Sequence, residues 1–242
     1  NHNHILLYAR DFDSLFAERS GIGLSPDLSG FGNPDGDPRG PWKAVPVDGP
    51  GGAKKGNPYY EFLGVQGYWR YSKETMQKKH EDGLILSTPR GLQQKYFLSQ
   101  AAASRKTVTS WWDDAGFTST ATRRLTELMG GAYFDTPKPV ELIGRMLELF
   151  TFNEPDALVL DFFAGSGSTA QAVMEANAVD GGSRRFLLVQ LDEVPNEKSE
   201  AAAAGFVSIA QIARERLRKV GNLIRERDGS DQSATDIGFR AL

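Results

Sequence analysis

The fold is decided by residues 158–169, which read L-V-L-D-F-F-A-G-S-G-S-T. An apolar run ends in an aspartate, Asp161, and a tight Gly-Ser-Gly then leads into the small residues that open a helix. This order predicts a buried strand, a close turn and a helix, which is how a nucleotide-type binding loop is built.

The sequence around this loop alternates between helix and strand patterns. Downstream of a helix that opens at T-P-K-P (136–139), it predicts a strand over 157–162, a helix over 168–177, a strand over 185–191 and a last helix over about 205–227 with a dense Arg/Glu face turned outward. A β-loop-α-β-α order is half of a doubly wound sheet. The predicted fold class is therefore α/β, with a partial Rossmann-like sheet.

The chemistry of the loop favours S-adenosylmethionine over a dinucleotide. G-S-G-S-T-A (165–170) matches the dinucleotide fingerprint, but D-F-F-A separates the strand from its first glycine. The carboxylate of Asp161 would repel a pyrophosphate, whereas it suits the ammonium of an amino-acid end. The helix start favours the carboxylate of that same end. In the simpler alternative, Asp161 only caps the next turn. Gln190, Asp192 and Glu193 follow the second strand as candidates for a ribose contact.

Composition excludes several classes of protein. The chain has 242 residues, 40% of them hydrophobic and 24% charged, with a net charge of -3 and no cysteine. Disulfides, thiolate catalysis and cysteine zinc sites are therefore ruled out, and a reducing, cytoplasmic location is expected. His2 and His4 lack an obvious third ligand, so no metal site is predicted. No membrane helix or signal peptide is predicted. The first residue is not Met, so we expect a fragment or a processed product.

The first half of the chain carries weaker signals. Residues 4–10 predict a core strand, and the Gly- and Pro-rich stretch 20–58 predicts little regular structure. Further patterns indicate a strand or hairpin over 59–71, a helix capped by Ser72 that ends near 82–83, a strand over 84–88 and a helix over 122–131. Residues 70–106 hold eight Lys/Arg against three acids, a basic excess that the overall charge hides.

Three segments together resemble one enzyme family. T-P-K-P-V-E-L-I, then L-V-L-D-F-F-A-G-S-G-S-T-A-Q-A-V, then R-R-F-L-L-V-Q-L-D-E are similar to the carboxyl-terminal half of β-class DNA amino-methyltransferases, above all the modification (Mod) subunit of type III restriction-modification systems. N-H-N-H-I-L-L-Y-A-R, N-P-D-G-D-P-R-G-P-W and G-Y-W-R-Y-S resemble family stretches too. The likeness runs along most of the chain and is strongest over 136–193.

The resemblance implies a cofactor, S-adenosylmethionine, and a set of residues that hold it. These are Thr136, Pro137 and Lys138 before the first cofactor strand, Asp161, Phe162, Phe163, Ala164, Gly165, Ser166, Gly167, Ser168 and Thr169 in the methionine-binding loop, and Gln190 at the ribose position. Gln190 stands where many relatives have an acid, so this sequence departs from the family pattern at the ribose position. Ser168 stands where Thr is commoner.

The family's catalytic D-P-P-Y motif is absent from this sequence. Its nearest match, N-P-Y-Y (57–60), lacks the second proline and a preceding core strand, so we interpret it as a decoy and assign no catalytic residue. The implied organisation is a core strand of the methyltransferase domain at 1–10, an irregular inserted target-recognition region at 11–135, the cofactor-binding half at 136–227 and a tail at 228–242. We expect the catalytic motif in a missing N-terminal half of the same protein.

The resemblance implies site-specific methylation of double-stranded DNA at adenine N6, with cytosine N4 left open as the target. Expected DNA contacts are Arg39, Lys43, Arg70, Lys73, Lys78 and Lys79. A homodimer is expected, with a restriction subunit as a further partner and no membrane. Two alternatives remain from the sequence: a non-catalytic module that binds DNA and cofactor, and an NAD-binding enzyme.

Overall fold

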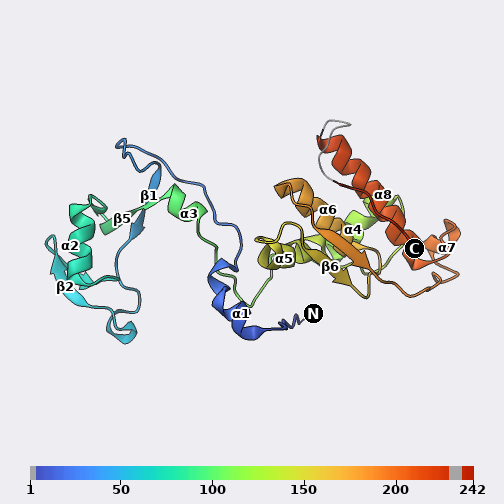
Figure 1. The fold of residues 1–242 in the computed structure, drawn as a ribbon, viewed down its shortest axis with the longest axis horizontal. Helices are drawn as coiled ribbons and strands as arrows, with labels where there is room; N and C mark the ends of the chain where they lie inside the picture. Colours follow the sequence, from blue (N-terminus) through green and yellow to red (C-terminus); the bar gives the residue numbers. More distant parts are fainter. Residues whose placement is uncertain (1–3, 229–235) are drawn as a thin grey trace. The chain divides into compact units, whose positions relative to one another are not determined.

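The computed structural model describes residues 4–228 and 236–242, and the chain divides into two compact units. Unit 1 comprises residues 1–24 and 107–242, and unit 2 comprises residues 25–106. Figure 1 shows the ribbon coloured along the chain. Unit 2 is therefore an insertion between two segments of unit 1. Within unit 2, the Arg105 guanidinium lies 3.5 Å from the Ser25 hydroxyl, so the two ends of the insertion lie beside each other.

Unit 1 contains a short parallel sheet with its crossover helix. Its elements are α1 Phe12–Ala17, η1 Arg19–Gly21, α4 Thr118–Met129, α5 Val140–Thr151, β6 Leu158–Asp161, α6 Ser168–Asp180, β7 Arg185–Leu188, α7 Glu200–Ala203 and α8 Ile209–Asp228. β6 and β7 pair in parallel, with Leu158 opposite Arg185 and Asp161 opposite Leu188. The β-loop-α-β-α order over 157–227 is as the sequence predicts, with element ends shifted by a few residues.

Helices α5, α6 and α8 pack on one face of this sheet. Val173 of α6 is fully buried between Leu147 of α5 and Val159 of β6. On its other side, α6 packs through Met174 against the apolar stripe of α8. Ile237 and Phe239 join that α8 cluster, so the described part of the predicted tail is packed on the unit. The opposite face of the sheet is exposed and apolar at Leu158 (58%), Leu160 (46%), Leu187 (50%) and Val189 (42%).

The predicted core strand at 4–10 does not form. The described residues of this segment have no strand assignment, and Leu6 and Tyr8 are 74% and 84% exposed. An apolar run becomes a strand only where a neighbouring strand offers hydrogen bonds and where a second layer covers the run. In the described residues β6 and β7 pair only with each other, and this segment finds no such neighbour.

Unit 2 is a small α+β fold with its own core. Its elements are β1 Trp42–Pro46, η2 Gly52–Lys55, β2 Tyr59–Phe62, β3 Val65–Tyr68, α2 Lys73–Glu81, β4 Ile85–Thr88, β5 Gly91–Phe97 and α3 Leu98–Ala102. β5 is the centre of an antiparallel sheet in the order β1-β5-β4, and β2 and β3 form a hairpin. Val47, Trp69, Met76 and Leu92 are buried together under α2 and these strands.

Several local predictions in unit 2 are confirmed, but two strands, β1 and β5, were missed. β1 lies within the Gly- and Pro-rich stretch 20–58, for which little regular structure was predicted. The 59–71 segment forms the β2–β3 hairpin, and the Ser72 hydroxyl accepts a bond from the Thr75 amide at the start of α2. Sequence reasoning did not find β5, because G-L-Q-Q-K-Y-F breaks the apolar alternation with Lys95, which is itself buried.

Candidate functional site

The glycine loop joins the end of β6 to the start of α6, at the carboxyl edge of the parallel sheet. The Val189 amide donates to the Asp161 carbonyl (2.8 Å), and the Ala164 amide donates to the Val189 carbonyl (3.1 Å). These two bonds extend the strand pairing into the loop. In open α/β sheets, ligands bind outside this edge.

Asp161 braces the loop from within. Its Oδ1 accepts the Phe163 amide at 2.9 Å, and its Oδ2 accepts the Thr169 hydroxyl at 2.6 Å. The capping role that the sequence offered as the simpler alternative is therefore present. An ionised carboxylate has about four acceptor sites, so two remain for a ligand, and the residue is half-buried rather than enclosed.

Two glycines adopt backbone conformations that other residues rarely reach. Gly165 has φ of 51° and Gly167 has φ of 81°. A Cβ on Gly167 would lie 3.3 Å from the Ala213 Cβ of α8, and a Cβ on Gly165 would lie 3.3 Å from the Phe134 ring. The loop is thus held against α8 and the 134 segment, and its tight path depends on both glycines.

Gln190 contacts the loop directly. Its side-chain oxygen accepts the Gly165 amide at 2.7 Å, and its side-chain nitrogen donates to Glu193 at 3.1 Å. This residue therefore ties the end of β7 to the first glycine of the loop. Glu193, another of the three candidates for the ribose contact, is thereby hydrogen-bonded to Gln190.

The other predicted cofactor residues differ in exposure. Phe162 and Phe163 are 63% and 87% exposed beside the loop, whereas Ala164, Ser166, Gly167 and Ser168 are buried within it. In the T-P-K-P segment, Pro137 is buried and both Thr136 and Lys138 are exposed. Phe134, two residues earlier, approaches Gly165, a contact that the sequence did not reveal.

Sequence reasoning also missed Arg216 on α8, which it placed on the outward Arg/Glu face. Its Nη1 donates to the hydroxyls of Ser166 (2.8 Å) and Ser168 (2.9 Å), and only 3% of the residue is exposed. Burial lowers the pKa of the Arg216 guanidinium to about 10. The helical spacing could have indicated this position, because Arg216 follows the buried Ile212 by one turn and so lies on the same face of α8.

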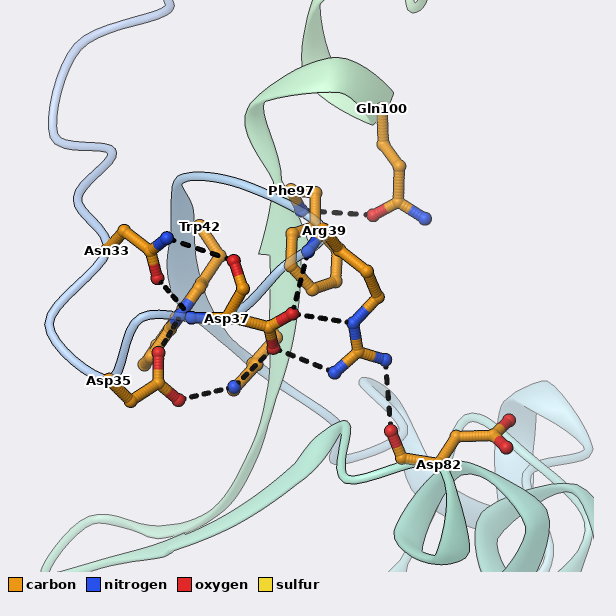
Figure 2. A network of polar contacts seen from close by, with 9 residues as sticks. Asn33, Asp35, Asp37, Arg39, Trp42, Asp82, Phe97 and Gln100 are labelled. Carbon is orange, nitrogen blue, oxygen red and sulfur yellow. Dashed lines mark hydrogen bonds and ion pairs between the residues drawn. The ribbon is translucent and has the colours of Figure 1, made fainter.

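In unit 2, the predicted DNA contact Arg39 belongs to a network of ion pairs (Figure 2). Its Nε and Nη2 donate to the two oxygens of Asp37 at 2.8 and 2.7 Å, and its Nη1 donates to the Asp82 carbonyl at 2.9 Å. Buried Lys95 donates to Asp35 and, at 2.6 Å, to Asp37. The Arg39 and Lys95 side chains hold the pKa of Asp37 far below its usual range.

The other predicted DNA contacts lie on the surface of unit 2. The Lys43 ammonium lies 4.4 Å from the centre of the Phe31 ring, and the Lys79 ammonium lies 4.6 Å from that of Tyr71. Arg70 donates to the Asp48 carbonyl at 3.0 Å. Lys73 and Lys78 are exposed on α2. These side chains leave their charges near solvent, unlike Lys95.

Charge separates the two units. Residues 25–106 carry twelve Lys/Arg and eight Asp/Glu, a net charge of +4, whereas the whole chain is at -3. The remaining residues therefore carry -7. Three of the basic unit's acids also face cations within it, since Asp35 and Asp37 pair with Lys95 and Asp27 lies near Lys43.

The described ranges contain neither a metal-binding cluster nor a membrane-spanning helix. No group of three or more His, Asp and Glu side chains there is arranged to hold a metal ion, and His2 falls outside those ranges. Across residues 4–228 and 236–242, none of the helices has both the length and the apolar character needed to cross a bilayer.

Comparison with known proteins identifies the family. Residues 48–193 match the model of a DNA methylase family. Since that match covers more than half of the chain, this chain belongs to the DNA methylase family. It is 33% identical over 210 residues to the type III restriction-modification enzyme StyLTI Mod subunit of Salmonella typhimurium, covering 84% of this chain and 31% of that protein.

Two other relatives match shorter segments. The chain is 39% identical over 139 residues to the EcoPI Mod subunit of Escherichia phage P1, which covers 57% of this chain and 21% of that subunit. It is 33% identical over 159 residues to the type II methyltransferase M.KpnI of Klebsiella pneumoniae, covering 66% of this chain and 37% of that enzyme. The chain thus spans roughly a fifth to a little over a third of the length of these relatives.

Proposed function

We propose that this chain is the cofactor-binding and DNA-contacting part of a site-specific DNA adenine-N6 methyltransferase of the type III Mod kind, with S-adenosylmethionine as the methyl donor. The observation that carries the proposal is the loop at 161–169. A braced carboxylate, two left-handed glycines and a helix start meet there at the carboxyl edge of a parallel strand pair. Cytosine N4 remains the alternative target.

The donor groups of the loop fit the amino-acid end of S-adenosylmethionine. Asp161 retains acceptor sites for an ammonium, and the positive end of α6 favours a carboxylate. Phe162 and Phe163 expose ring surface beside the loop, and Gln190 with Glu193 lies at the next strand end, where a ribose would be met. When bound, the cofactor supplies an activated methyl group, which needs no covalent enzyme intermediate.

The catalytic residues of this proposed enzyme lie outside this chain. The N-P-Y-Y stretch has structural contacts: Asn57 donates to the carbonyls of Pro50 and Gly52, and the Tyr60 hydroxyl donates to the Tyr71 carbonyl. These bonds support the interpretation of 57–60 as a decoy. The bare apolar face of the β6–β7 sheet supports a partial Rossmann-like sheet that is covered by the N-terminal half of the same protein.

Unit 2 is the proposed target-recognition region, and double-stranded DNA is its proposed partner. Its net charge of +4 beside an acidic remainder of the chain suits phosphate contacts. As in the type III relatives, a restriction subunit is proposed as a further partner, together with a homodimer of the complete protein.

Calorimetry on the 242-residue chain tests the cofactor proposal. We expect S-adenosylmethionine and S-adenosylhomocysteine to bind and NAD not to bind. Asp161→Asn should weaken binding by about ten- to a hundredfold, because a hydrogen bond to a charged group contributes roughly 1.5–3 kcal/mol. Asp156→Asn, at an exposed turn before β6, should leave binding unchanged. Binding of NAD alone would overturn the proposal.

Methyl transfer to DNA separates the enzyme from the binding module. With labelled S-adenosylmethionine, the isolated chain should bind cofactor and DNA without labelling the DNA, because no catalytic motif is assigned within it. Labelled DNA would show instead that the catalytic groups lie within these 242 residues.

A further inference from the structure

Arg216 reaches the glycine loop from the last helix of unit 1. It lies on α8, and its side chain makes four polar contacts with the loop and with the first turn of α6. Nη1 lies 2.8 Å from the Ser166 hydroxyl, 3.3 Å from the Ser166 carbonyl and 2.9 Å from the Ser168 hydroxyl, and Nε lies 2.7 Å from the Gln171 side-chain oxygen. One guanidinium thus spans both serines of G-S-G-S.

The backbone of α8 also abuts the loop. Ala213 lies three residues before Arg216, and its Cβ is the atom that a side chain at Gly167 would meet at 3.3 Å. A glycine at 167 therefore lets α8 approach closely enough for Arg216 to reach the serines. The loop conformation and the position of α8 depend on each other at these two points.

The charge of Arg216 is not paired in the ordinary way. Within the described residues, each hydrogen-bond acceptor of this side chain is neutral, and the acid that acts on it, Glu175, is reached through Gln171, which donates to Glu175 at 2.7 Å. Burying a guanidinium costs free energy unless its charge is offset nearby. A neutral side chain could fill the same space without the free-energy cost of burying a charge. We therefore infer that the positive charge of Arg216 has a function at the loop.

We propose that Arg216 is a positioning residue that fixes the glycine loop for the amino-acid end of the cofactor and supplies positive charge behind that end's carboxylate. The inference rests on the proposed function, because it takes the loop as the cofactor site. Arg216 acts through Ser166 and Ser168. Its five donors form a rigid fork that a lysine does not reproduce.

Binding of two ligands that differ only in the amino-acid end tests this role. S-adenosylhomocysteine carries that end, and 5′-methylthioadenosine lacks it. We expect Arg216→Gln to weaken S-adenosylhomocysteine at least tenfold and methylthioadenosine less than twofold in calorimetry. Arg216→Lys should fall between wild type and Arg216→Gln for the first ligand. Arg218→Gln, two residues along α8 and 59% exposed at its side chain, should change neither affinity.

Hydrogen exchange of the ligand-free chain gives a second readout. Arg216→Gln should speed amide exchange in residues 163–169 and leave α5 and unit 2 unchanged, with Arg216→Lys intermediate. If Arg216→Gln does not fold, the lysine variant carries both measurements.

Two results would overturn the inference while leaving the cofactor site intact. One is equal weakening of both ligands, which shows a general structural role. The other is unchanged exchange in the loop. If the wild-type chain binds neither ligand, the proposed function fails first, and this inference fails with it.

Discussion

Lys95 shows how one residue sets the shape of a surface loop. It occupies the central strand of the unit 2 sheet, and its ammonium gathers Asp35 and Asp37 from the loop that precedes β1. Asp37 then aligns Arg39, whose third bond reaches the Asp82 carbonyl beyond the end of α2. The Gly- and Pro-rich stretch around residue 37 is therefore ordered by charge pairing rather than by regular structure.

Replacing Asp37 with asparagine should destabilise unit 2 in a pH-dependent way. The folded-state pKa of Asp37 is depressed, mainly by the hydrogen bond from Arg39 and then by Lys95. Its contribution to stability is therefore present above the unfolded value of about 3.9 and is lost as pH falls through the folded pKa. Urea unfolding should show the largest gap between wild type and Asp37→Asn near pH 7, and the gap should narrow below about pH 4.

Glu61→Gln, on the exposed side of β2, is the matched control and should track wild type across that range. A gap that stayed constant with pH would show that the Asp37 carboxylate does not contribute through its charge.

Arg39 in this network and Arg216 in unit 1 show why individual site residues were hard to predict. Arg39 looked like a free cation because sequence does not show which acids fold back on it. Arg216 looked like a surface residue because its neighbours on α8 are charged. Both side chains bind partners that are distant in sequence: Arg39 binds the Asp82 carbonyl and Arg216 binds the Ser166 hydroxyl. Such pairings depend on tertiary packing.

The glycine loop adds a second connection between α6 and α8, which also pack together through Met174. β6 and α6 are adjacent in sequence, whereas α8 joins them through Gly167 and Arg216. Gly167 combines a left-handed backbone with a close approach to Ala213, so either condition alone would disfavour a side chain there.

Gly167→Ala should therefore lower both stability and cofactor affinity. An alanine in the left-handed region costs roughly 1–2 kcal/mol, and its Cβ would press on α8. The matched control is Gly144→Ala in α5, where a Cβ meets nothing within 4 Å. That change should instead stabilise the chain by roughly 0.5–1 kcal/mol. Thermal unfolding measures the stability of each variant, and calorimetry with S-adenosylhomocysteine measures its affinity. A Gly167→Ala variant with unchanged stability would contradict the packing argument.

At the level of elements, sequence periodicity was informative wherever one face of an element is buried. The order of strands and helices over 157–227 follows from apolar spacing, and so do the β2–β3 hairpin and the capped start of α2. The strand predicted at 4–10 was wrong, because an apolar run carries no information about whether a neighbouring strand exists. β5 was missed because Lys95 interrupts its pattern.

The whole chain combines an acidic unit that holds the candidate cofactor site with a basic insertion. Opposite charges separate the two proposed tasks, because phosphates are attracted to the insertion and repelled by the remainder. The division of the chain into recognition and cofactor parts stays a prediction. The compact unit at 25–106 is shorter than the predicted recognition region at 11–135, because residues 11–24 and 107–135 belong to unit 1.

Charge reversal on α2 tests this division. Lys73→Glu, Lys78→Glu and Lys79→Glu together should weaken binding to double-stranded DNA. The slope of log affinity against log salt concentration should decrease in magnitude by about three. Affinity for S-adenosylhomocysteine should not change. A control variant that reverses the exposed Lys198, Arg218 and Arg225 of unit 1 has the same net charge. Fluorescence anisotropy over a salt series measures both, and equal losses would contradict a specific role for α2.

The meeting of Ser25 and Arg105 has a consequence for how unit 1 folds. The entropy lost on closing a loop depends on the distance that its ends must cover and grows only slowly with loop length. An insertion that folds by itself and brings its own ends together presents unit 1 with a junction that is already closed. The entropy that unit 1 loses on folding around the insertion is then small and does not depend on the length of the insertion.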